Sequence, residues 1–270
     1  MTMDFGARTD TGRVRETNED SLRYAPETNL FILSDGMGGQ ASGEVASRLA
    51  TDATLAHCLE AESNSALPLV GEPIEGVSEA SNWLASAIRL ANRVVYTASQ
   101  QNSEQQGMGA TVVAVWIKND RMSVAHVGDS RVYRLRGGAL EQLTSDHSFV
   151  AEQVRRGLMT EGEAAQSKLQ NVLMRALGID PEVEPDVTEE LVMEGDTILL
   201  CSDGLTRELS DQQIAGVLTS IDDPEEAADR LIELANQTGG GDNISAIVVR
   251  HADRAVGAFG RIGRWFKDSR

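Results

Sequence analysis

The sequence predicts one α/β domain built on antiparallel sheets, and three observations lead to this fold class. Short β-branched or alternating runs follow one another with only turns between them, as antiparallel strands do. Helical patterns come in pairs between these blocks, and no internal repeat divides the 270 residues. Because such a chain can bury a sizeable core, we expect a single domain over residues 1–250.

The expected strands are short runs rich in Val, Ile and Leu. In chain order they are LFILS (30–34), TVVAVWI (111–117), MSVAHV (122–127), RVYRL (131–135), DTILLCS (196–202) and SAIVVR (245–250). Most of them are neighbours in the sequence, which favours hairpins over crossover connections.

The expected helices show start signals as well as apolar periodicity. Helical patterns cover residues 43–59, 80–99 and 149–155. Two further helices begin at the capping boxes Thr160 to Glu163 and Ser210 to Gln213, and Pro224 stands at the first position of another.

Three segments differ from this pattern. Residues 60–78 have the Pro, Gly, Ser and Glu content of a surface loop, and residues 144–185 interrupt the strands with helical pieces. Residues 251–270 form a basic tail, in which apolar residues recur at every third position at Val256, Phe259, Ile262 and Trp265. Such spacing suits a basic amphipathic helix on a membrane surface, but interleaved glycines weaken it, so we do not favour membrane contact.

Composition excludes several classes of function. A net charge of −18 and a pI near 4.6 argue against nucleic acid as the main ligand and leave metal ions open. Cys58 and Cys201 lie too far apart for a Cys-x-x-Cys pair, which indicates neither a disulfide framework nor a thiolate zinc site. The N-terminal residues carry acids and no apolar run, so we expect a cytoplasmic protein with no signal peptide and no membrane span.

Four acids stand at strand ends beside glycine or in tight turns: Asp35, Asp129, Asp203 and Asp242. A single Asp-Gly pair is ordinary turn chemistry. Four of them together indicate a site for Mg²⁺ or Mn²⁺, because these hard cations take oxygen ligands and a glycine lets a backbone carbonyl approach the ion.

An ordered series of motifs resembles the metal-dependent protein phosphatases of type 2C, and specifically their bacterial branch. The motifs run from about residue 5 to residue 249: DTGRVRETNED, LSDGMGGQASGEVAS, MGATVVAV, HVGDSRVYRL, LTSDHS, NVLMRALG, GDTILLCSDGLT and GGGDNIS. The resemblance implies an α/β sandwich, in which helix pairs flank two antiparallel sheets and a binuclear metal centre lies at one edge of the sheets. Residues 144–185 match the family's flap beside the active site, although a plain connecting subdomain is the alternative.

The resemblance also assigns metal ligands, for two Mn²⁺ or Mg²⁺ ions and for a third in the bacterial branch. Asp35 would bridge two metals, and Asp203 with Asp242 would complete one of them. The Gly36 carbonyl would bind the other metal, which Asp20 would hold through water. A separate pair, Asp129 with Asp203, would bind the third ion.

Other positions take roles around these metals. Arg15 falls on the family's phosphate-binding arginine, whose planar fork suits a bidentate grip on phosphate oxygens. Asn243 would orient Asp242. Gln40 stands where the family usually has a histidine that protonates the leaving oxygen; glutamine cannot titrate, so acid catalysis here would need water or His126. For His126 and His147 we expect packing roles.

The expected function is dephosphorylation of phosphoserine and phosphothreonine in proteins. Two cations about 4 Å apart lower the pKa of a bridging water, whose hydroxide attacks phosphorus in line without a covalent intermediate. The resemblance implies that phosphorylated proteins are the substrates and that a Ser/Thr kinase is the opposing partner. We expect the chain to act as a monomer.

Two alternatives stay open at this point. CSDGLTR, from Cys201 to Arg207, has the Cys-x₅-Arg spacing of cysteine-dependent phosphatases, but it lacks the preceding histidine and most loop glycines. A phosphatase fold that has become a weakly active binding module is the other alternative. Dependence of activity on metal would distinguish the metal-dependent phosphatase from the cysteine-dependent one. Any turnover would exclude the binding module.

Overall fold

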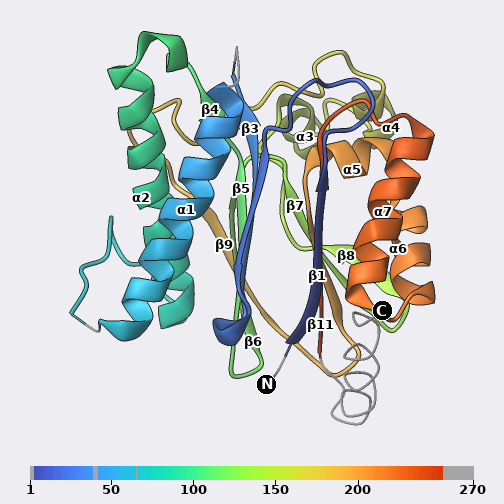
Figure 1. Cartoon of the computed structure of the whole chain (residues 1–270), viewed down its shortest axis with the longest axis horizontal. Coiled ribbons are helices and arrows are strands. Elements are labelled where there is room, and N and C mark those ends of the chain that lie inside the picture. Colours follow the sequence, from blue (N-terminus) through green and yellow to red (C-terminus); the bar gives the residue numbers. More distant parts are fainter. Residues whose placement is uncertain (1–2, 39–41, 65, 252–270) are drawn as a thin grey trace, which may run out of the picture.

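A computed structural model describes residues 3–38, 42–64 and 66–251, and it shows a sandwich of two antiparallel sheets with helices on both outer faces (Figure 1). The sandwich that the sequence and the resemblance predicted is therefore confirmed. Gln40 and residues 252–270 lie outside the described residues, and with them most of the predicted tail.

One sheet has the strand order β1-β11-β10-β7-β8, with every neighbouring pair antiparallel. Its strands are β1 (Met3–Asp10), β11 (Ile244–His251), β10 (Thr197–Cys201), β7 (Arg131–Arg136) and β8 (Ala139–Gln142). This sheet contains both ends of the described chain, because β1 pairs with β11 along its whole length.

The second sheet has the order β2-β3-β5-β6-β9, and the short β4 pairs with the end of β3. Its strands are β2 (Asp20–Ala25), β3 (Leu30–Met37), β4 (Gly109–Ala110), β5 (Val112–Lys118), β6 (Arg121–Val127) and β9 (Asp186–Leu191). Strands β5 and β6 form a hairpin, as their adjacency in the sequence predicted.

Helices cover the outer face of each sheet. The long helices α1 (Ser42–Ser63) and α2 (Glu79–Gln101) pack on the second sheet, whereas α5 (Asp203–Glu208), α6 (Asp211–Ser220) and α7 (Pro224–Thr238) lie on the first (Figure 1). The short helices α3 (Phe149–Arg155) and α4 (Glu161–Ala165) belong to the segment 144–185, and the 3₁₀ turns η1 (Pro26–Thr28) and η2 (Ser103–Gln105) join other elements.

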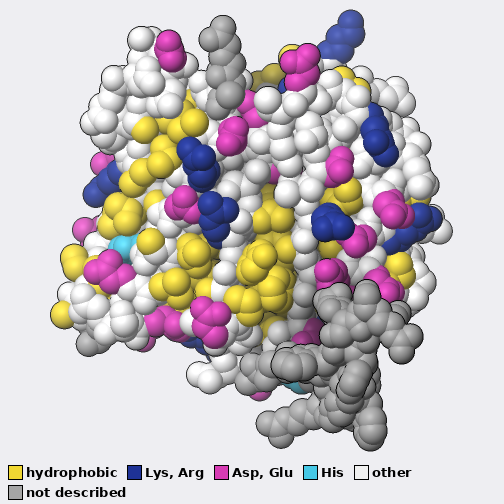
Figure 2. All heavy atoms as spheres, viewed as in Figure 1, with side chains coloured by type: hydrophobic (Ala, Val, Ile, Leu, Met, Phe, Trp, Pro, Cys, Tyr) yellow, Lys and Arg dark blue, Asp and Glu magenta, His cyan; other side chains and the backbone are white. Residues whose placement is uncertain are grey.

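Three apolar layers hold the sandwich together. One fills the space between the sheets and includes Phe31, Val113 and Ile247; the other two lie between each sheet and its helices. Most central strands are buried on both faces, so they read as continuous apolar runs in the sequence. Figure 2 shows hydrophobic side chains along the middle of one face. Between β1 and β2, the rings of Phe5 and Tyr24 lie 4.7 Å apart.

The structure confirms the start signals and corrects some boundaries. Both predicted capping boxes form, and Pro224 opens α7. The predicted loop at 60–78 starts too early, because α1 continues to Ser63. Strands β1, β2, β8 and β9 were not predicted: they are the edge strands of the two sheets, and polar residues such as Arg8 and Thr188 interrupt their apolar pattern. In the described part of the chain, none of the helices has the length and apolar character that crossing a membrane requires.

Candidate metal and phosphate site

An acid-lined cavity opens at the end of the sandwich where β3 leads to α1 and β10 leads to α5. Its walls include most of the residues that the sequence singled out, together with several that it did not: Arg15, Glu19, Asp35, Gly36, Thr111, Asp129, Asn171, Asp203, Arg207, Asp242 and Asn243. Asp20 is buried beside Asp35 and does not line the cavity. Residues more than two hundred positions apart in the chain therefore meet at one place.

Strands β2 and β3 place two acids side by side. Asp20 is the register partner of Asp35 in this antiparallel pair, and directly opposed residues point to the same face of a sheet. Beyond Asp35 the chain must pass very close to the start of α1: a Cβ on Gly36 would lie 2.0 Å from the Gly43 carbonyl oxygen. Glycine at position 36 is therefore a steric requirement of the turn that follows Asp35.

The first sheet supplies the acids on the other side of the cavity. Asp203 is the first residue of α5, directly after β10, and Asp242 lies in the turn before β11. These two segments touch, because a Cβ on Gly204 would lie 2.1 Å from the Asn243 carbonyl oxygen. The SDG and GGGDN stretches thus meet at neighbouring strand ends, as the sequence predicted.

Hydrogen bonds fix one oxygen of Asp20 and leave the other without a partner. Its Oδ2 accepts from the hydroxyls of Ser202 at 2.9 Å and Ser245 at 2.6 Å. Oδ1 of Asp20 and Oδ1 of Asp203 are both buried and have no hydrogen-bond partner among the described residues. A buried carboxylate oxygen without a partner is costly, so these atoms are suited to a cation that the chain itself does not supply.

Burial and mutual repulsion disfavour the charged forms of the acids at this site. Burial raises the pKa of Asp20 to about 7 and that of Asp129 to about 8, and the neighbouring carboxylates add to both effects. The pKa of Asp35 is raised well above its usual range by burial and by Asp20, Asp203 and the other acids. Burial raises the pKa of Asp203 as well, against the attraction of Arg207. Divalent cations would remove this repulsion, and the residues present therefore fit a metal centre.

The backbone next to Asp35 is held by the turn that carries Asp129. The Asp35 N–H donates to the Thr111 hydroxyl oxygen at 3.0 Å, and this hydroxyl in turn lies 2.7 Å from that of Ser130. The sequence did not indicate a role for Thr111 or Ser130, because Thr and Ser are common in turns. Their effect is to tie the second sheet to the loop between β6 and β7 at the cavity.

Two arginines line the same cavity and pair with its acids. Arg15 contacts Asp242 through Nε at 2.9 Å and through Nη2 at 3.0 Å. Arg207 pairs with Asp203 and donates from Nη1 to Asp242 at 3.2 Å. The sequence singled out Arg207 only as the partner of Cys201, whereas the structure turns it toward the acids.

Asn243 ties down the loop that carries Arg15. Its side-chain amide donates to the carbonyls of Thr11 and Thr17 and accepts from the Glu19 N–H, while its backbone N–H donates to Asp242. Glu19 also lines the cavity, and burial raises the pKa of its carboxyl. Glu19 was missed because an acid in a Thr-Asn-Glu-Asp run reads as a solvated loop charge.

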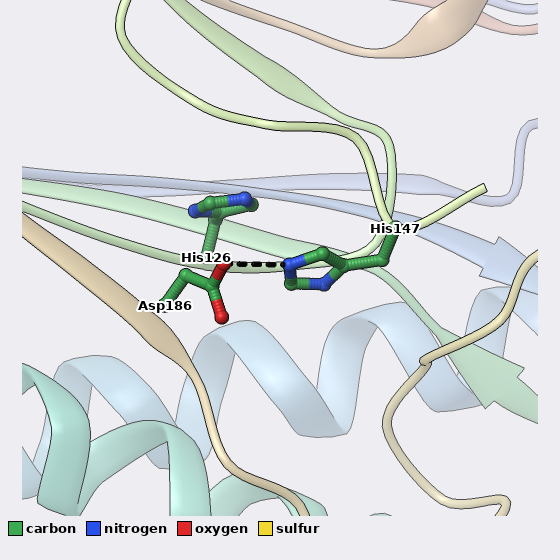
Figure 3. A group of neighbouring side chains, drawn as sticks. All are labelled: His126, His147 and Asp186. Atoms are coloured by element: carbon green, nitrogen blue, oxygen red, sulfur yellow. Dashed lines mark ion pairs between the residues drawn. The ribbon is translucent and has the colours of Figure 1, made fainter. Parts of the chain in front are cut away.

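A second polar cluster joins the flap segment to the Asp129 turn. The rings of His126 and His147 stack at 4.7 Å, and Asp186 lies 3.2 Å from His147 Nε2 (Figure 3). His147 Nδ1 accepts from the Gly128 N–H at 3.1 Å, so the neutral ring carries its proton on Nε2, toward Asp186. Arg175 already pairs with Asp186 at 2.5 Å.

This arrangement argues against a metal at His126, His147 and Asp186, although their ligand atoms lie within 4.8 Å of one another. Nε2 of His147 would have to lose its proton while Nδ1 still accepts a hydrogen bond. Burial, with a smaller effect of His126, lowers the pKa of His147 to about 4, which keeps the ring neutral. The packing role expected for both histidines agrees with these contacts.

The cysteine alternative fails on the position of the thiol. Cys201 is fully buried in the layer between the first sheet and its helices, and burial raises its pKa to about 12. The nucleophile of a cysteine-dependent phosphatase is an exposed thiolate, and the thiol of Cys201 is neither exposed nor ionised.

Comparisons with known proteins agree with this geometry. A sequence profile of the family described as Protein phosphatase 2C matches residues 12–240. The serine/threonine protein phosphatase PstP of Mycobacterium tuberculosis is 39% identical over 257 residues, which cover 95% of this chain and 46% of that protein. The serine/threonine phosphatase stp of Listeria monocytogenes is 36% identical over 245 residues and is covered to 93%.

Solved structures give the same result. The crystal structure of the M. tuberculosis phosphatase PstP/Ppp has a TM-score of 0.81 at 38% identity, covering 93% of this chain and all of that one. The catalytic domain of PstP in complex with two manganese ions has a TM-score of 0.78 at 39% identity, covering 93% of this chain and 99% of that one. The chain belongs to the protein phosphatase 2C family.

Proposed function

We propose that this chain is a Mn²⁺- or Mg²⁺-dependent phosphatase of phosphoserine and phosphothreonine in proteins. The observation that carries the proposal is that Asp35, Asp129 and Asp203 line one cavity and that Asp20 lies opposite Asp35 in the strand register. The pKa of each acid is raised, and Asp20 and Asp203 each have a buried oxygen with no hydrogen-bond partner among the described residues. A relative of the same fold holds two manganese ions, which supports this assignment.

The carboxylates would hold the metals together with the Gly36 carbonyl. We assign Asp35 between two ions, Asp203 and Asp242 to one of them, and Asp20 to the other; Asp129 with Asp203 would take a third ion. When bound, such ions supply a hydroxide nucleophile at neutral pH and offset the charge on the phosphoryl oxygens. Ser202, Ser245 and Thr111 position the acids before any ion arrives.

Arg15 is the residue that would bind the phosphate. Its guanidinium lies at the cavity, and about half of its side chain is exposed, so it can turn from Asp242 to an incoming dianion. Once metals neutralise Asp242, the attraction that holds Arg15 there weakens, and the fork is available for two parallel hydrogen bonds to phosphate oxygens.

The substrates would be phosphorylated proteins, with a Ser/Thr kinase as the opposing enzyme and a cytoplasmic monomer as the working form. Asn171 and Leu173 of the flap line the cavity, which gives segment 144–185 a direct route to influence access. Names of relatives as serine/threonine protein phosphatases support this substrate class.

The test is a release assay on phosphoserine and phosphothreonine peptides with Mn²⁺, with Mg²⁺ and with chelator, for the wild type and Asp35→Asn. We expect turnover that needs the metal and that the substitution abolishes. If turnover persists in chelator and also in Asp35→Asn, the proposed metal-dependent mechanism is wrong. As a matched control, Asp229→Asn on the outer helix α7 should behave as the wild type.

A further inference from the structure

Arg207 stands out among the cavity residues because it pairs with two of the acids that we assign to the metals. Its Nη2 pairs with Asp203 Oδ2, and its Nη1 donates to Asp242 Oδ2 at 3.2 Å. One guanidinium therefore bridges two acids from different segments of the first sheet.

The position of Arg207 on α5 favours this contact. Asp203 and Arg207 are four residues apart on the same helix, so their side chains lie on one face. The Arg207 side chain is 27% exposed, against 52% for Arg15, which approaches from a loop. Of the two arginines, Arg207 is thus the more confined and the more completely committed to the acids.

Two arginines and one backbone N–H surround the carboxylate of Asp242. Its Oδ1 pairs with Arg15 Nε and accepts from the Asn243 N–H at 2.9 Å, and its Oδ2 accepts from both Arg15 Nη2 and Arg207 Nη1. An ionised carboxylate has about four lone-pair sites, and these four contacts occupy them. A cation that enters here would also repel the two guanidinium groups. A metal that takes Asp242 must therefore displace at least one arginine.

We propose that Arg207 is a built-in competitor of the divalent cation: in the metal-free protein it pairs with Asp203 and occupies Asp242, and its contact with Asp242 is lost when metal binds there. The inference rests on the proposed metal-dependent function and adds to it a residue that sets the metal concentration at which the enzyme works. In the metal-free state the same contact stabilises the protein, since it neutralises part of the acid cluster.

The test is a Mn²⁺ titration by isothermal titration calorimetry on the full chain, with chelator-treated wild type, Arg207→Ala, Arg207→Lys and Arg230→Ala. We expect Arg207→Ala to bind Mn²⁺ about tenfold more tightly and to melt at a lower temperature in chelator. Arg230→Ala removes an exposed arginine of α7 that pairs with nearby Glu233, and it should match the wild type.

Arg207→Lys separates direct competition from a simple effect of net charge. A lysine keeps the charge but cannot bridge two carboxylates with a planar fork, so we expect Mn²⁺ affinity between those of the wild type and Arg207→Ala. Affinity equal to the wild type in Arg207→Lys would overturn the competition, as would weaker binding in Arg207→Ala, which would make Arg207 a support of the metal site. A wild-type chain that binds no Mn²⁺ would instead overturn the proposed function, and this inference with it.

Discussion

Asp20 and Asp35 are direct partners in the antiparallel register between β2 and β3, so two buried carboxylates lie on the same face of one sheet. Two like charges at opposed positions destabilise a strand pair. The fold retains them, and Ser202 and Ser245 hold only one oxygen of Asp20. The pair therefore lowers the stability of the metal-free protein, and a cation bound between the two acids would make it stabilising.

The first prediction concerns Asp35→Asn. Because burial and neighbouring acids raise the pKa of Asp35, its charged form opposes folding at neutral pH. In chelator, Asp35→Asn should melt higher than the wild type, by about 3 °C. With Mn²⁺ the order should reverse, since the wild type alone gains from the ion. Differential scanning calorimetry checks both, and a variant that is less stable in chelator would contradict the account.

The second prediction is the pH dependence of the metal-free protein. An acid whose folded pKa lies above its unfolded value binds more protons when folded, so stability falls as pH rises through that interval. For Asp20 the interval runs from the ordinary pKa of 3.8 to about 7, and for Asp129 from 3.8 to about 8. The free energy of unfolding in chelator should therefore decrease between pH 5 and about pH 8. Urea titrations of the wild type and Asp129→Asn measure it, and parallel profiles for the two would count against Asp129.

The third prediction uses Cys201→Ala. The thiol is buried and its pKa is raised to about 12, so removing it should leave Mn²⁺-dependent turnover within about twofold of the wild type. The free energy of unfolding should fall by about 1 kcal/mol, because a small buried group is lost. Turnover with a phosphopeptide and unfolding in urea are the measurements. Loss of activity in a folded variant would restore the cysteine mechanism.

The fourth prediction concerns His147→Ala. This change removes the acceptor of the Gly128 N–H and the contact of Asp186, and it should cost about 2 kcal/mol of stability. The backbone of His147 also joins Gly128 and Met174, so hydrogen exchange should rise in residues 144–175 before the whole protein unfolds. His57→Ala, which removes a buried histidine on α1 that hydrogen-bonds to Ser86 of α2, is the control. Unchanged exchange in the flap would show that His147 does not hold it.

The fifth prediction concerns Gln40, which lies outside the described residues. Since glutamine cannot donate a proton by titrating, Gln40→His should raise kcat on phosphoserine peptides by about tenfold, or about 1.4 kcal/mol of barrier. p-Nitrophenyl phosphate should change much less, because its phenolate leaves without a proton. The gain should fade above the histidine pKa. Equal effects on both substrates at every pH would show that position 40 does not act as an acid.

The central strands and the helix starts were predictable because their signals are local. The apolar runs that became β3, β5, β6, β7, β10 and β11 are buried on both faces, and capping boxes or Pro224 mark the starts of α4, α6 and α7. The edge strands β1 and β8 were missed, since one side of an edge faces solvent and carries polar residues. Their pairing depends on partners far away in the chain, such as β11 for β1.

By itself the sequence determined the candidate acids, because Asp35, Asp203 and Asp242 stand at strand ends beside glycine, and it indicated the family through an ordered series of motifs. Only the tertiary structure decided which groups neutralise these acids. The sequence suggested Arg207 as a partner of Cys201 in a cysteine-dependent site. In the structure, Arg207 on α5 pairs with Asp203 and Asp242, and the thiol of Cys201 is buried at the end of β10. Sequence spacing determines which face of a helix a residue occupies. The acid with which that residue pairs can come from a different segment of the chain, and only tertiary packing brings the two side chains together.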